Sequence, residues 1–189
     1  MTLPSSIRRI VLIGFMGAGK STTGALLAAN LGWRFVDSDH AIETRAGRTI
    51  AQIFAEEGED AFRSLETDAI RDHARSEHLV LALGGGAVEN ELTRNVLAGL
   101  SETRIVFLDA PLEVMVARCL AQPNAAERPV LADRERLLQR FSDRLPHYRR
   151  AHLTVATAQL APEEVVARIL FGLAQSETAV HALEENHPA

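Results

Sequence analysis

The sequence is poor in several residue types, and each shortage narrows what the chain can be. It contains a single cysteine, Cys119, so no internal disulfide can form, which agrees with a reducing cytoplasm. No apolar run approaches the length that crosses a membrane, and the first residues lack the apolar segment of a signal peptide. Aromatic residues make up 5% of the chain and the formal net charge is −5. We therefore expect a cytoplasmic protein with no nucleic-acid or membrane partner, and we take it to be a monomer.

Lysine is almost absent: of the twenty basic residues, nineteen are arginine and one is Lys20. Lys20 lies in residues 14–21, Gly-Phe-Met-Gly-Ala-Gly-Lys-Ser, which match the phosphate-binding loop G-x-x-x-x-G-K-[ST]. This loop needs a compact ammonium that reaches two phosphates, and a planar guanidinium is a poor substitute there. The only lysine of the chain lies at this position, and this favours a phosphate-binding loop over a chance glycine-rich turn.

The segments on either side of the loop support this interpretation. Residues 9–13 form a short apolar run typical of a buried strand, and residues 21–31 repeat apolar side chains at helical spacing. The N–H groups of the loop can then surround an anion at the amino end of a helix. The predicted nucleotide contacts from this segment are Gly14, Gly17, Ala18, Gly19, Lys20, Ser21 and Thr22.

Five predicted strands alternate with amphipathic segments: residues 8–13, 33–37, 78–83, 103–108 and 152–156. This alternation predicts an α/β fold with a five-stranded parallel sheet and helices on both faces. Thr49 and Gln52 resemble a helix capping box, and Pro111 and Pro162 suit the first positions of helices. We predict a mobile loop at residues 122–129 and one domain, residues 1–175, followed by a disordered tail at 176–189.

Ligands of parallel sheets bind beyond the carboxyl ends of the strands, so residues just after each strand are candidates. Asp37 and Asp39 follow the second strand. One carboxylate can orient the water shell of Mg²⁺ while the other faces an acceptor hydroxyl. Asp39 can also cap a helix that starts at His40, and the two roles can coexist. Because the third strand does not end in Asp, we assign the metal role to Asp37, together with the hydroxyl of Ser21.

Two further patterns lie downstream. Arg63 and Glu66 are three residues apart, so they are neighbours on a helix face, and taken alone they are typical of a surface ion pair. Gly84, Gly85 and Gly86 follow the third strand, where three glycines allow the backbone to approach a ligand closely.

Two arginines complete the candidate set. Arg128 closes the predicted mobile loop, where an arginine on a lid can reach a transferring phosphoryl group. Arg144 lies near the end of a predicted helix, and alone it is weak evidence for a site.

In combination, these patterns resemble the shikimate kinase family. The resemblance spans about residues 8–173 and rests on the order of the phosphate loop, Asp37-Ser38-Asp39, Phe62-Arg63-x-x-Glu66, Gly84-Gly85-Gly86, Arg128-Pro129-Val130-Leu131 and Arg144-x-Pro-x-Tyr148. It implies a P-loop kinase of the nucleoside monophosphate kinase type, with a substrate-binding segment at about 38–70 and a mobile lid at about 119–132.

The resemblance also implies a reaction, the transfer of the γ-phosphate of ATP to the 3-hydroxyl of shikimate, with Mg²⁺ as cofactor. Asp39 would lie at the acceptor hydroxyl, and Lys20 and Arg128 would stabilise the charge of the phosphates. Arg63 and Arg144 would hold the shikimate carboxylate. Further implied contacts are the backbone of Gly84, Gly85 and Gly86, with Glu66 behind Arg63 and with Ile50, Phe54 and Phe62 against the ring.

Three alternatives remain open: a kinase for another polyol acid such as gluconate, a nucleoside monophosphate kinase, and a non-catalytic sensor of shikimate or nucleotide. The chain also departs from the family at the lid, because residues 122–127 carry no basic side chain to stack on adenine. Arg118 is a candidate for that contact, although its spacing to Arg128 is long.

Overall fold

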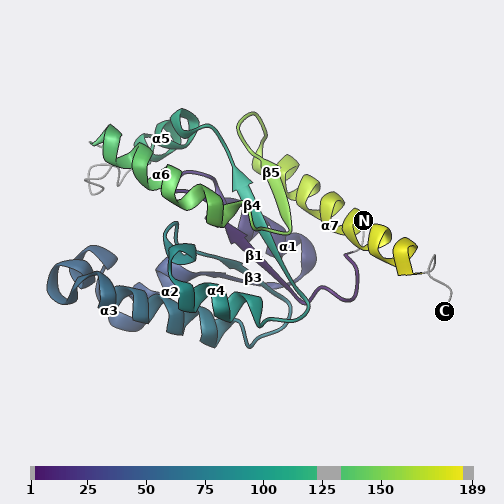
Figure 1. The fold of residues 1–189 in the computed structure, drawn as a ribbon, viewed down its shortest axis with the longest axis horizontal. Helices are drawn as coiled ribbons and strands as arrows, with labels where there is room; N and C mark the ends of the chain where they lie inside the picture. Colours follow the sequence, from purple (N-terminus) through teal and green to yellow (C-terminus); the bar gives the residue numbers. More distant parts are fainter. Residues whose placement is uncertain (1–2, 123–132, 185–189) are drawn as a thin grey trace.

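The computed structural model describes residues 3–122 and 133–184, and its centre is one sheet of parallel strands in the order β2-β3-β1-β4-β5 (Figure 1). The strands are β1 (Arg9–Ile13), β2 (Arg34–Asp37), β3 (Leu79–Ala82), β4 (Thr103–Asp109) and β5 (Leu153–Ala156). Each begins and ends within one residue of its predicted bounds. The predicted five-stranded parallel sheet is therefore confirmed.

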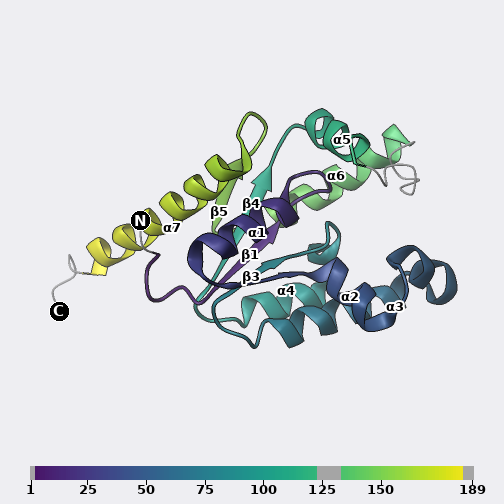
Figure 2. The ribbon, with the colours of Figure 1, turned by 180° about the vertical axis from the view of Figure 1, so that it is seen from behind.

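The helices are α1 (Lys20–Leu31), α2 (Ser38–Ala46), α3 (Ile50–His73), the 3-10 turn η1 (Ala87–Glu89), α4 (Glu91–Ala98), α5 (Leu112–Leu120), α6 (Arg134–Tyr148) and α7 (Pro162–Glu184). Helix α1 packs against α7, while α3 packs against α2 and α4 (Figures 1 and 2). The two helix groups lie on opposite sides of the sheet in both views, as the strand–helix alternation predicts.

The central strands are buried on both faces, which is why they consist almost entirely of apolar residues. Ile10, Val80 and Val106 have no exposed surface. Strands β1 and β3 are neighbours, and Leu83 N donates to Leu12 O just beyond them (3.0 Å). The phosphate loop after β1 and the glycine turn after β3 therefore emerge side by side at the carboxyl edge of the sheet.

Several local predictions can be checked at helix ends. Thr49 and Gln52 form the predicted capping box at the start of α3, and Pro162 is the first residue of α7. Pro111 is the residue before α5 rather than its first residue, because its ψ of 140° is extended and not helical. Helix α3 is interrupted at Gly58, whose φ of 84° is left-handed, and glycine adopts this conformation without strain.

The chain end differs from the prediction of a disordered tail at 176–189. Helix α7 continues to Glu184. Residues 176–184 contain no Gly or Pro, so nothing in their backbone chemistry stops the helix. The rest of the predicted tail and most of the predicted lid lie outside the described residues. Within the described ranges, none of the helices combines the length and the apolar character needed to span a membrane.

Candidate active site

The phosphate-binding loop joins β1 to α1 as predicted. Gly17 has a φ of 75°, and a side chain there would collide with the carbonyl oxygen of Met115. Lys20 is the first residue of α1, and its Nζ donates to Gly14 O (2.8 Å) and Phe15 O (3.0 Å). Burial of this ammonium lowers the pKa of Lys20 from its ordinary value, partly offset by the negative charges of Asp39 and Asp37. The loop therefore holds its own lysine inward, over the position where phosphates bind.

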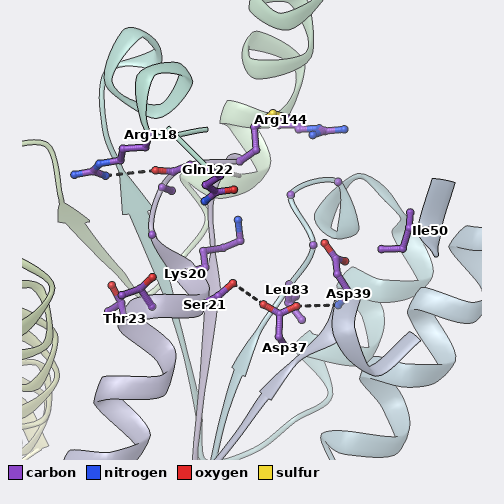
Figure 3. A pocket seen from close by; sticks show the side chains of 18 of the residues that line it. Lys20, Ser21, Thr23, Asp37, Asp39, Ile50, Leu83, Arg118, Gln122 and Arg144 are labelled. Atoms are coloured by element: carbon purple, nitrogen blue, oxygen red, sulfur yellow. Dashed lines mark hydrogen bonds between the residues drawn. The ribbon is translucent and has the colours of Figure 1, made fainter. Parts of the chain in front are cut away.

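Asp37 connects the phosphate loop to the second strand (Figure 3). Its Oδ2 accepts a hydrogen bond from the Ser21 hydroxyl (2.6 Å). Its Oδ1 accepts from the backbone N–H groups of Asp39 (3.0 Å) and His40 (3.4 Å), so Asp37 is the N-cap of α2. Asp39 is therefore not the cap of a helix that starts at His40, which was the alternative role considered from the sequence. The helix begins at Ser38, one residue after the actual cap, and Asp39 lies in its first turn with a carboxylate free for another role.

Asp39 points into the cavity beside Lys20 (Figure 3). Its Oδ1 is buried and has no hydrogen-bond partner among the described residues. Burial raises the pKa of Asp39 to about 6, and the neighbouring charge of Asp37 acts in the same direction, while Lys20 opposes the shift. A carboxylate with this pKa is largely ionised at neutral pH and still basic enough to accept a proton.

Glu66 is the buried support of Arg63. It is 1% exposed, and its Oε2 accepts from Arg63 NH1 (2.7 Å). Its other oxygen, Oε1, has no partner among the described residues, and burial raises the pKa of Glu66 to about 7 despite the opposing charge of Arg63. The interpretation of Arg63 and Glu66 as a surface ion pair is therefore wrong. The pair is internal, and it fixes the direction of the Arg63 guanidinium.

The glycine turn is crowded by the site's own side chains. A methyl group on Gly84 would collide with Asp39 Oδ1 and lie 2.8 Å from Glu66 Oε1. On Gly86 it would lie 2.6 Å from Arg63 NH2 and 3.0 Å from Arg144 NH2. From the sequence we expected a ligand to lie close to the backbone of the glycine turn. In this structure, the groups that lie close to the turn are two carboxylates and two guanidinium groups of the protein itself. A Cβ atom at Gly84 or Gly86 would displace these groups, whereas one at Gly85 would have its nearest neighbour at 3.6 Å.

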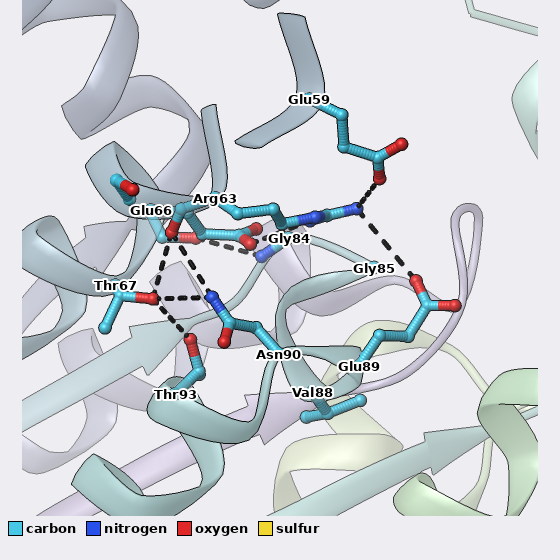
Figure 4. Close-up of polar contacts among 12 residues, drawn as sticks. Glu59, Arg63, Glu66, Thr67, Gly84, Gly85, Val88, Glu89, Asn90 and Thr93 are labelled. Carbon is cyan, nitrogen blue, oxygen red and sulfur yellow. Dashed lines mark hydrogen bonds and ion pairs between the residues drawn. The ribbon is translucent and has the colours of Figure 1, made fainter. Parts of the chain in front are cut away.

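Arg144 reaches the same place from α6. Its guanidinium lies over the ring of Phe15, with CZ 5.5 Å from the ring centroid. Both its Nε and its NH2 lie 2.8 Å from Glu89 Oε2, and that oxygen is 4.0 Å from Arg63 NH2 (Figure 4). Arg63 and Arg144 therefore converge, as predicted, and Glu89 is a third member of the cluster that no sequence motif indicated.

These groups line one cavity of about 1200 Å³. Its lining includes the phosphate loop from Gly17 to Thr22 together with Asp37, Asp39, Arg63, Gly84, Gly85, Gly86 and Arg144. Ile50, Phe54 and Phe62 supply an apolar wall. Gly14 is not part of the lining, but its carbonyl holds Lys20. The predicted site residues thus line one cavity, apart from Gly14 and from Arg128, which lies outside the described residues.

Arg118 also lines this cavity, beside the phosphate loop. Its NH2 donates to Thr157 O (2.6 Å) and its NH1 to Thr157 Oγ1 (3.1 Å), close to Gly17 O (3.4 Å; Figure 3). Arg118 is absent from the predicted site residues because its spacing to Arg128 along the chain is long. The sequence signal that could have identified Arg118 as a site residue is its position in the last turn of the helix after the fourth strand.

Comparison with known proteins agrees with this geometry. Residues 16–174 match the family model described as shikimate kinase. The chain is 40% identical over 174 residues to shikimate kinase of Nitratidesulfovibrio vulgaris, covering 88% of this chain and 98% of that protein. It is 44% identical over 174 residues to shikimate kinase of Geobacter sulfurreducens, covering 89% and 92% of the two chains.

The fold was also compared with solved structures, and these again include shikimate kinases. Shikimate kinase from Acinetobacter baumannii in complex with shikimate has a TM-score of 0.79 and 38% identity, covering 87% of this chain and 92% of that one. A gluconokinase from Sinorhizobium meliloti has a TM-score of 0.61 at 21% identity, which shows a shared fold alone. The family model and the close relatives cover most of the chain, and the sheet carries a complete phosphate loop. The chain belongs to the shikimate kinase family.

Proposed function

We propose that the protein transfers the γ-phosphate of ATP to the 3-hydroxyl of shikimate, giving 3-phosphoshikimate and ADP. As a member of its family it is an ATP-dependent kinase. The observation that carries the proposal is the position of Asp39. Its carboxylate lies in one cavity with Lys20 of the phosphate loop and with Arg63 and Arg144. This arrangement fits a phosphate donor and a small hydroxylated acid on opposite sides of one proton acceptor.

At the donor end, the chain supplies charge and position rather than a covalent intermediate, which is what phosphoryl transfer requires. The N–H groups of the loop would surround the phosphates, and Lys20 would exchange its contacts with Gly14 O and Phe15 O for contacts with phosphate oxygens. Arg128 would add a second cation from the lid. Arg118 would contact the adenine side of the nucleotide, since its NH1 lies 3.4 Å from Gly17 O of the phosphate loop.

Ser21 and Asp37 would hold Mg²⁺. They fit this ion because a hydroxyl and a carboxylate oxygen already lie 2.6 Å apart at the edge of the phosphate loop. The described residues contain no group of three or more His, Cys, Asp or Glu side chains that could hold a metal ion. Magnesium that arrives with a nucleotide keeps waters and phosphate oxygens as ligands, so two protein oxygens are enough. When bound, the ion would neutralise charge on the phosphates.

At the acceptor end, Arg63 and Arg144 would bind the carboxylate of the acid, since a guanidinium presents paired donors to a planar carboxylate. The ring would lie against Ile50, Phe54 and Phe62, and the glycine turn would contact it through the backbone. The acceptor hydroxyl would then face Asp39, which takes its proton as the oxygen attacks the γ-phosphate. The raised pKa of Asp39, about 6, suits a base that works near neutral pH.

We further propose that the protein works as a cytoplasmic monomer without a nucleic-acid or membrane partner. The net charge of −5 and the single, buried Cys119 support this proposal. Gel filtration with light scattering tests the monomer, since a dimer would double the measured mass.

The function is tested by ADP release with ATP and Mg²⁺ in the presence of shikimate, quinate, gluconate or AMP. We expect turnover with shikimate far above that with the other three, and a 3-phosphate in the product by NMR. Asp39→Asn should lower kcat by roughly 100-fold or more while ATP still binds. Absence of turnover with shikimate, or faster turnover with gluconate, would refute the proposal.

A further inference from the structure

Glu89 occupies the donors that an acid substrate needs. One of its oxygens, Oε2, contacts both Nε and NH2 of Arg144 at 2.8 Å, which is the paired edge that a guanidinium offers to a carboxylate. The same oxygen lies 4.0 Å from Arg63 NH2 (Figure 4). A single carboxylate group thus already spans the two arginines assigned to the substrate.

The backbone around Glu89 is fixed, so its reach to the arginines is built into the fold. Arg94 NH1 donates to Glu89 O (2.6 Å) and to Val88 O (2.9 Å). Asn90 Nδ2 donates to Thr67 Oγ1 (3.0 Å) on α3, the helix that also carries Arg63 (Figure 4). The turn η1 is thereby tied to α3 directly beside the guanidinium that Glu89 faces.

At Arg63 and Arg144 the carboxylates already outnumber the guanidinium groups, so a further acid can use both arginines fully only if one carboxylate moves. Two guanidinium groups are contacted by three carboxylates: Arg63 by Glu59 (3.1 Å) and Glu66 (2.7 Å), and Arg144 by Glu89. Glu66 is buried and cannot leave, while the ion pair of Glu59 is with Arg63 and does not reach Arg144. Among the described residues, Glu89 is the carboxylate with an oxygen within 4.0 Å of both arginines, and its side chain is 35% exposed, so it can rotate into solvent.

We propose that Glu89 is an affinity-determining residue that competes with the substrate carboxylate for Arg144 and Arg63 and is displaced when the acid binds. This inference rests on the proposed function, because it takes shikimate as the acid. In its role as a competitor, Glu89 keeps the guanidinium of Arg144 oriented and neutralised, and it lowers the affinity for the acid by the free energy of its own contact. Two carboxylates on one guanidinium edge would repel each other, so they exclude one another.

The experiment measures shikimate binding by calorimetry, which does not depend on turnover. Glu89→Gln and Glu89→Ala should each bind shikimate about 3- to 10-fold more tightly than the wild type, the range expected for loss of one partly exposed ion-pair competitor. Methyl shikimate has no charged carboxylate, so its binding should change by less than about twofold in both variants.

Glu91→Gln is the matched control. Glu91 is exposed two residues along the chain, and its substitution removes the same charge without touching either arginine. It should change the shikimate affinity by less than about twofold, since salt screens exposed charges at this range. An equal gain in Glu91→Gln would mean that net charge, and not competition, is responsible.

Weaker or unchanged shikimate binding in the Glu89 variants would overturn the inference. That result is expected if Glu89 only orients Arg144 and does not compete with the substrate. This failure is distinct from failure of the proposed function. In the first case the wild type still phosphorylates shikimate; in the second it neither binds nor phosphorylates it, and both proposals fall.

Discussion

Asp39→Asn should make the protein more stable at the same time as it removes activity. Asparagine has nearly the shape of aspartate and no charge. The native fold keeps the Asp39 carboxylate in a buried position where its pKa is about 6, against 3.8 for the ordinary residue. A raised pKa means that the folded state binds the proton more tightly than the unfolded chain does, so ionisation of this group works against folding.

The size of the effect depends on pH in a defined direction. The fold tolerates the protonated Asp39 carboxyl, so this group costs no stability below about pH 3.8. As the pH rises from 3.8 through the folded pKa of about 6, the cost to the free energy of unfolding grows. The difference between these two pKa values corresponds to a loss of about 3 kcal/mol at about pH 8. At about pH 5, where the folded group is still mostly protonated, the loss is about 1.5 kcal/mol. Asp39→Asn should recover most of this free energy.

Urea unfolding followed by circular dichroism measures the change. At about pH 8 the free energy of unfolding of Asp39→Asn should exceed that of the wild type by about 2 to 3 kcal/mol, and at about pH 5 by roughly half as much. Asp60→Asn is the control, because Asp60 is exposed on α3 and its substitution should change stability by less than about 0.5 kcal/mol.

Two results would refute this reasoning. If Asp39→Asn is no more stable than the wild type at about pH 8, the folded protein does not disfavour the charge and Asp39 is better solvated than its buried Oδ1 indicates. If the gain is equal at both pH values, it comes from packing or hydrogen bonding of the amide and not from the removed charge.

The remaining predictions concern catalysis. Arg63→Lys should raise KM for shikimate by about 10-fold or more, because the planar pair of donors is lost, while KM for ATP stays within about twofold; an unchanged KM for shikimate would assign Arg63 a structural role. Gly84→Ala should lower kcat/KM by at least about 10-fold, because the methyl group collides with Asp39, whereas Gly99→Ala, whose Cβ would find its nearest neighbour at 3.5 Å, should behave like the wild type. The logarithm of kcat/KM should rise with pH up to about 6 and then level off as Asp39 loses its proton, and a flat profile between about pH 5 and 7 would contradict its role as a base.

Features that depend on neighbours along the chain could be predicted from the sequence. The phosphate loop was predictable because Gly17, Gly19 and Lys20 each satisfy a local requirement of backbone conformation or phosphate contact. The strands were predictable because a sheet buried on both faces needs uninterrupted apolar runs. The capping box of Thr49 likewise involves a partner only three residues away.

Features that depend on contacts between distant segments could not be predicted from the sequence. The pair of Arg63 and Glu66 has the spacing of any surface pair, and only the packing of α3 against its neighbours makes it internal. Glu89 meets Arg144 across fifty-five residues of sequence, and no pattern connects the two. The helix that continues through residues 176–184 was missed because loss of apolar periodicity was taken as loss of helix, although propensity alone favours helix there.

The two halves of the site are joined by one carboxylate, and this limits how far they can move apart. Asp37 Oδ2 accepts from Ser21 at the start of α1, and Asp37 Oδ1 accepts from the N–H of Asp39 in the first turn of α2. The donor loop and the proposed base are therefore each one hydrogen bond from the same side chain. Since an in-line phosphoryl transfer needs the attacking oxygen and the phosphate at a fixed separation, this connection sets that separation before either substrate binds. Asp37→Asn keeps one acceptor and loses the other, so it should loosen the spacing as well as the proposed magnesium site, and its loss in kcat should persist at saturating Mg²⁺.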